Sequence, residues 1–172
     1  MVRLGGNRYL DIAAAMKNAA RLLRELDAAD SQADSVAALL ETRDTVVDDV
    51  VKAEARYQAA GDALVEYAAV LDSAQVSARN AATSATYAEE RRWDAEKLVN
   101  RYRRDRARAL DAVNFEEAAR LRRLIQLKQT EADEEATSIA QHRTVVESAI
   151  QDRDQAAQRT MDQIQAITAN DE

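Results

Sequence analysis

The chain has 172 residues, with no Pro, no Cys and only three Gly. Proline and glycine mark most sharp turns and strand ends, so their scarcity argues against a fold rich in loops or sheets. The absence of cysteine excludes a disulfide, a thiolate metal site and a cysteine nucleophile. Hydrophobic residues make up 47% of the chain but aromatic residues only 4%, and the net charge is −7, so we expect thin helix-on-helix packing without a thick core.

The N-terminal stretch MVRLGG is expected to form a loose leader before a first helix over residues 7–27. Apolar residues recur in that helix at the spacing of one helical face, as at Ile12 and Met16. No long uncharged apolar run is present, so we predict neither a secretory signal peptide nor a transmembrane segment. The Asp- and Ser-rich stretch that follows favours a corner, with Ser35 as a candidate cap of the next helix.

A long seam of apolar residues, spaced alternately by three and four, runs through the middle of the chain. It predicts one long helix over residues 36–112, with weak points near Gly61 and at residues 80–86. The side chains of the seam are large near Leu64 and Tyr67, and after them the seam residues are mainly alanine. We expect the large residues to lie where three helix ends converge and the alanines to let two helices approach closely.

A turn is predicted before a last helix over residues 115–169. Asn114 can cap that helix, and Glu117 stands at the position that completes a capping box. The expected fold is therefore all-α: an elongated antiparallel helical hairpin of long, coiled-coil-like helices with an additional short N-terminal helix. We expect residues 1–172 to form a single helical domain.

Residues 56–85, RYQAAGDALVEYAAVLDSAQVSARNAATSA, resemble the N-terminal helical-hairpin domains of actinobacterial type VII secretion substrates, which are related to the WXG and LXG groups. The family pattern is A-L-x-x-Y-A-x-x-L-x-x-A-Q-x-x-A. It is filled here by Ala63, Leu64, Tyr67, Ala68, Leu71, Ala74, Gln75 and Ala78. Two features depart from the family: Trp93 is followed by Asp94 and Ala95 without the Trp-x-Gly glycine, and no Tyr has an acid four residues later.

The resemblance implies a delivery module, either the N-terminal domain of a polymorphic toxin or a stand-alone protein. Its implied partners are the type VII export machinery and a small helical protein, or a second copy of the chain. The resemblance further implies synthesis in the cytoplasm and secretion without a signal peptide. We expect Leu64, Tyr67, Leu71, Ala74, Gln75 and Ala78 to form the packing surface that carries the family motif.

A second stretch, NFEEAARLRRLIQLK, is similar to the UVR motif of bacterial excision-repair proteins, a short helical hairpin used for protein contacts. That motif usually has Asp where this chain has Arg123. The start of a capped helix favours the same residue types for reasons of capping and packing alone, and short motifs often match by chance. The alternative function is therefore an intracellular coiled-coil scaffold or adaptor that uses this hairpin or its basic tip.

Residues suited to catalysis are few. The single histidine, His142, lacks the Glu spacing of a di-iron bundle. Adjacent acids such as Glu134 and Glu135 diverge by about 100° on a helix and do not face one site. The chain also lacks a phosphate-binding glycine loop and a nucleophile–base arrangement. We therefore predict no enzyme activity, no cofactor and no metal site.

The predicted turn is surrounded by positive charge. The segment from Arg91 to Lys128 contains twelve Lys and Arg residues and only six Asp and Glu residues, although the whole chain has a net negative charge. This distribution favours contact with an acidic surface, and a solvated turn is the simpler alternative. Without stacking aromatic residues or a reader motif, sequence-specific nucleic-acid binding is not expected. The candidate interaction surface comprises Trp93, Arg101, Arg104, Arg108, Arg120 and Arg123.

Overall fold

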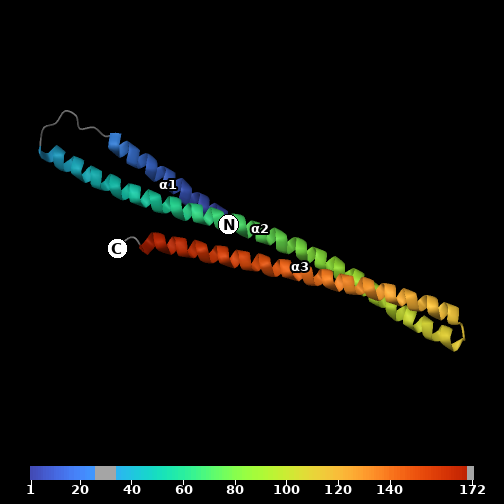
Figure 1. Cartoon of the computed structure of the whole chain (residues 1–172). Coiled ribbons are helices and arrows are strands. Elements are labelled where there is room, and N and C mark those ends of the chain that lie inside the picture. Colours follow the sequence, from blue (N-terminus) through green and yellow to red (C-terminus); the bar gives the residue numbers. More distant parts are fainter. Residues whose placement is uncertain (26–33, 170–172) are drawn as a thin grey trace. The chain divides into compact units, whose positions relative to one another are not determined.

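Figure 1 shows the computed structural model of the chain, which describes residues 1–25 and 34–169. The helices are α1 (Val2–Glu25), α2 (Asp34–Asp111) and α3 (Phe115–Ala169). Within these described residues, nearly every position is helical and no strand is present. The predicted all-α class and helical hairpin are confirmed. The predicted corner and the side chain of Ser35 lie outside the described residues.

The chain divides into two compact units. Unit 1 comprises Met1–Asp72 together with Asp152–Glu172, and unit 2 comprises Ser73–Gln151. Unit 1 contains α1, the first part of α2 and the end of α3. Unit 2 contains the rest of α2 and α3 and the turn that joins them. None of the three helices is apolar enough over its described length to cross a lipid bilayer.

The N-terminal residues are helical, so the predicted loose leader is wrong. Helix α1 starts at Val2, and Gly6 is buried against α2. A Cβ atom built on Gly6 would lie 2.9 Å from Cγ2 of Val65 and 3.1 Å from the carbonyl oxygen of Gly61. The glycine is therefore present because the backbones of α1 and α2 approach closely.

Gly61 is the other half of this contact and does not break α2, contrary to the predicted weak point. The helix is continuous through it, and a Cβ built there would lie 2.6 Å from Cδ2 of Leu10 and 3.1 Å from the carbonyl oxygen of Gly6. Close by, the rings of Tyr9 and Tyr57 lie 5.5 Å apart. These antiparallel contacts fix how α1 packs on α2 within unit 1.

The predicted break at residues 80–86 is also absent. The hydroxyl of Thr83 donates to the carbonyl oxygen of Arg79 at 3.0 Å, and that of Thr86 donates to the carbonyl oxygen of Ala82 at 3.1 Å. Both hydroxyls thus bond within the helix and do not compete with its backbone ladder. Helix α2 is continuous through this stretch and accommodates both threonine hydroxyls.

The core of unit 2 is made mainly of small residues. On α2, Ala88 is fully buried and Ala81 and Ala95 are each 5% exposed. On α3, Ala118 and Leu121 are each 4% exposed. Small residues allow two helices to approach closely, so this seam holds α2 and α3 together over a narrow strip.

The turn between α2 and α3 has the hydrogen bonds of a Schellman motif. The amide of Asn114 donates to the carbonyl oxygen of Ala109 at 2.8 Å, and that of Val113 donates to Leu110 at 3.0 Å. Val113 has a φ of 56°, in the left-handed region that normally takes glycine. The side chain of Asn114 then accepts a 3.1 Å hydrogen bond from the amide of Glu117, which confirms the predicted cap.

Gly6→Ala is expected to destabilise the protein. The added methyl group meets stiff Val65 and backbone atoms of α2, and such overpacking costs about 1–3 kcal/mol, more than the roughly 0.5–1 kcal/mol gained in helix propensity. Gly5→Ala is the matched control, since a Cβ there has no neighbour within 4 Å. Urea unfolding should show a loss for Gly6→Ala and a gain for Gly5→Ala. Equal effects would contradict the close crossing.

Asn114→Ala is expected to lower the free energy of unfolding by about 1 kcal/mol, because the first turn of α3 loses the acceptor for the amide of Glu117. Asn114→Asp, which keeps an acceptor, should retain most of the stability. Thermal unfolding followed by circular dichroism measures both variants. An unchanged melting temperature for Asn114→Ala would show that the cap contributes nothing.

Candidate interaction surface

Unit 2 leaves large apolar side chains in solvent outside its alanine seam. On α2, Val76 is 55% exposed and Tyr87 is 58% exposed. On α3, Leu127 is 54% exposed and Val145 is 44% exposed. Single exposed apolar residues are normal on monomeric proteins, so these residues are candidate contact positions for a partner and do not by themselves define a patch. The apolar periodicity of the sequence did not identify these positions because they lie off the seam.

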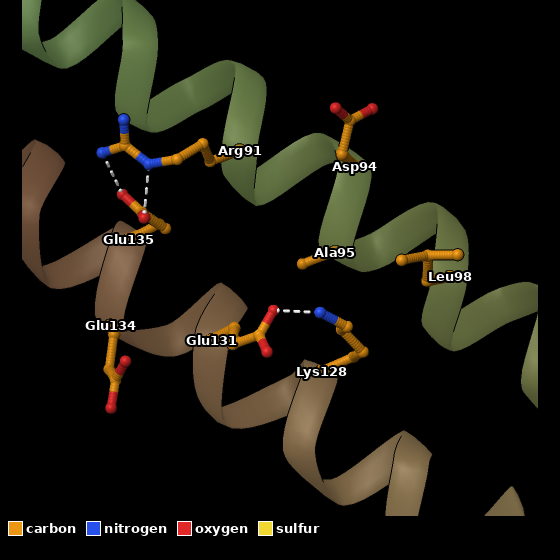
Figure 2. Close-up of a pocket in the computed structure, with 8 residues that line it drawn as sticks. All are labelled: Arg91, Asp94, Ala95, Leu98, Lys128, Glu131, Glu134 and Glu135. Atoms are coloured by element: carbon orange, nitrogen blue, oxygen red, sulfur yellow. Dashed lines mark hydrogen bonds and ion pairs between the residues drawn. The ribbon is translucent and has the colours of Figure 1, made fainter.

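Figure 2 shows a shallow hollow between α2 and α3 in unit 2. From α2, Arg91 donates a bidentate pair of hydrogen bonds to Glu135 of α3, at 2.6 and 2.8 Å. Lys128 pairs with Glu131 at 2.6 Å along α3. The Arg91–Glu135 pair links the two helices in one register.

The same ion pair shifts the ionisation of both partners. The hydrogen bonds from Arg91 hold the pKa of Glu135 below its ordinary value, and the positive charge of Arg91 acts in the same direction. Conversely, hydrogen bonding to Glu135 raises the pKa of Arg91. Near the turn, the hydrogen bonds from Arg120 lower the pKa of Glu117 in the same way. Both glutamates are therefore held in the charged form.

Trp93 is exposed on α2, with 58% of its surface in solvent. The ammonium nitrogen of Lys97 lies 2.9 Å from the centre of its ring, a cation–π contact one helical turn away. The ring is thus held by its own helix and keeps much of its area available to a partner. Its predicted role in an interface stays a prediction.

The arginines predicted near the turn fall into two groups. Arg101 and Arg108 both pair with Asp105, at 4.0 and 3.4 Å, and Arg120 pairs with Glu117 at 2.8 Å. Arg104 and Arg123 are exposed, and no acid among the described residues pairs with either. The structure thus neutralises part of the predicted basic surface and leaves the rest open.

Two further arginines lie near the turn in different surroundings. Arg122 on α3 is exposed and has no ion pair with any described residue. Arg106 is half-buried, and its Nε atom is buried without a hydrogen-bond partner among the described residues. The position of Arg106 at the seam explains the partial burial.

The residues of the family motif lie in α2 on both sides of the boundary between the units. Ala63 and Ala68 are buried at 5% and 3% exposure. Of the residues predicted to form the packing surface, Gln75 is exposed. The others are half-buried: Leu64, Tyr67, Leu71, Ala74 and Ala78. In unit 1, Tyr67 lines a shallow hollow with residues of α3 that include Ala156 and Thr160. The most buried positions are thus the small ones, and the large seam residues are less buried than expected.

The described residues contain no group of three or more His, Asp or Glu side chains placed to hold a metal ion. His142 is half-buried on α3. The acids of the hollow in Figure 2 include Glu131 and Glu135, and both are already paired with a cation. The chemistry that this surface offers is therefore apolar contact and charge.

Comparison of the chain with protein-family models, with curated proteins and with solved structures finds no match.

Glu135→Gln is expected to lower stability at neutral pH and to have less effect in acid. The pKa of Glu135 is lowered in the folded protein, so its contribution is full above the unfolded value of 4.5 and is lost as the pH falls through the folded value. Urea unfolding at neutral pH and well below pH 4.5 measures the difference between variant and parent. Glu134→Gln, which removes a neighbouring exposed acid that has no ion pair with a described residue, is the matched control and should leave stability at neutral pH nearly unchanged.

Proposed function

We propose that the chain is a non-enzymatic protein-interaction module that acts as the delivery domain of a type VII secretion substrate. The module presents a helical surface to the export machinery and to a small helical partner or a second copy of itself. The sequence pattern from Ala63 to Ala78 supports this assignment by its resemblance to such domains. The helical hairpin is the fold that this resemblance implies.

The observation that carries the proposal is the contrast between core and surface in unit 2. The seam between α2 and α3 buries mainly alanine, whereas Tyr87, Trp93 and Leu127 each keep more than half of their surface in solvent. Two helices bury only one strip of each other, and a second helical pair can cover the flanks as a four-helix bundle. Aromatic residues such as Trp93 are typical anchors of such contacts.

Local pairing of the charged groups also supports a binding role over catalysis. A general acid or base needs a perturbed carboxyl group that is available to a substrate. In the hollow of Figure 2, Arg91 holds Glu135 charged, and Lys128 occupies Glu131. These pairs fix the helices and leave the apolar flanks as the surface for recognition.

The alternative function, a scaffold or adaptor inside the cell, is favoured by a different observation. Arg104, Arg122 and Arg123 are exposed near the turn and have no acidic partner among the described residues. An adaptor that recognises acidic surfaces would use this end of unit 2 and would need no export. The two functions therefore differ in where the protein accumulates.

The export test uses the whole chain, tagged and expressed in an actinobacterial host with an active type VII system and in the same host lacking the system's ATPase. We expect the chain in the culture medium only when the ATPase is present. Tyr67→Ala with Leu71→Ala should reduce export, because both lie in the family motif. Ile12→Ala with Leu22→Ala, at exposed apolar sites on α1 outside both the motif and the candidate surface, is the matched control.

Equal release from both hosts would reflect lysis and would contradict the proposal. Retention in both hosts, with the chain folded, would favour the adaptor. A cytoplasmic marker protein measured in the same medium separates export from lysis.

A further inference from the structure

The turn of unit 2 exposes three large apolar side chains within six residues. Leu110 is 40% exposed, and Val113 and Phe115 are each 67% exposed. They lie where α2 stops and α3 begins, and Figure 1 shows the turn that joins these two helices. We call residues 101–123 the tip. An apolar group at a convex end is left uncovered by its own hairpin.

Val113 is the most informative of the three. Its φ of 56° is left-handed, a conformation that costs an ordinary residue about 1–2 kcal/mol and is disfavoured further by β-branching. Glycine would relieve this cost at the position after a helix where glycine is most common. The chain instead has an exposed valine there. Strain of this kind is found where the side chain serves a function.

The tip is also the positively charged end of an acidic chain. Residues 101–123 contain eight Arg and four Asp or Glu, a net charge of +4, which leaves −11 for the rest of a chain of net charge −7. Arg104, Arg122 and Arg123 have no acidic partner among the described residues. The unpaired arginines therefore stand on both helices behind the exposed apolar residues, whose nearest charged neighbours in the sequence are Asp111 and Glu116.

We propose that the tip binds the surface of an anionic lipid bilayer. Leu110, Val113 and Phe115 enter the boundary between headgroups and acyl chains, and the unpaired arginines contact lipid phosphates. The acidic remainder of the chain is repelled by the same surface, so the field favours approach by the tip. This inference concerns a different surface from the proposed function and does not depend on it.

Other acidic partners fit the tip less well. Nucleic acid offers phosphates to the arginines and a stacking partner to Phe115, but it gives Leu110 and Val113 little apolar contact. An acidic protein would need a pocket shaped to a convex turn. A bilayer interface accepts all three apolar residues without a specific pocket and supplies negative charge around them.

The test measures co-sedimentation of the whole chain with phosphatidylcholine vesicles that contain or lack phosphatidylserine. We expect binding only to the anionic vesicles. Replacing Arg104, Arg122 and Arg123 by Gln should weaken binding by about fivefold for each arginine. The matched control replaces three exposed, unpaired arginines outside the tip: Arg8, Arg79 and Arg143. It should bind as the parent does.

The apolar part is tested by Val113→Gly combined with Phe115→Ser. We expect binding to fall by about tenfold or more, because burial of these side chains is lost. Glycine suits the left-handed φ of residue 113, so this variant should keep its helical circular dichroism. Val76→Ser with Leu127→Ser removes exposed apolar residues elsewhere in unit 2 and should leave binding unchanged.

Three outcomes would overturn the proposal. One is equal binding to vesicles with and without phosphatidylserine, or to neither. The second is unchanged binding of the Val113→Gly, Phe115→Ser variant, which would show that apolar insertion plays no part. The third is tighter binding to duplex DNA or to an acidic polypeptide than to anionic vesicles, with the same loss in the arginine variant. Failure here leaves the export experiment unaffected.

Discussion

Close helix packing through small residues is the constraint on which the rest of the structure depends. In unit 1, Gly6 and Gly61 let the backbones of α1 and α2 approach closely. In unit 2, small alanine side chains such as Ala88 fill the contact between α2 and α3. Among the described residues, no large side chain is fully buried. The large apolar side chains, which would fill the core of a globular protein, are therefore at least partly exposed and available for contacts with other molecules.

Local patterns were enough to predict the helices and the turn. The spacing of apolar residues and the cap at Asn114 depend only on neighbours in sequence, and both appear in the structure. Glycine was misjudged because its effect depends on what lies opposite. In a single sequence Gly61 indicates a weak helix, but in the structure it is the point of closest contact with α1. The same error made the segment around Gly6 look like a leader.

The candidate surface was predictable only in part. In an antiparallel hairpin, residues at equal distances from the turn lie opposite each other. Arg91 and Glu135 are each 22 residues from Val113, so their pairing could have been predicted. The basic character of the tip follows from counting charges, but which arginines stay unpaired depends on side-chain geometry. The left-handed valine had no sequence signal, because glycine is the residue expected in that conformation. The features on which the lipid-binding proposal rests thus include a residue that breaks a local rule.

The symmetry of unit 2 about its turn also orders its contacts by loop length. Residues that meet beside Val113 close a loop of a few residues, whereas Arg91 and Glu135 are 44 residues apart in sequence. Closing a longer loop costs more chain entropy, although the cost grows only logarithmically. Assembly of α2 against α3 is therefore favoured to begin at the capped turn and to spread outward as a zipper, with the Arg91–Glu135 pair closing after the helix ends beside the turn have met.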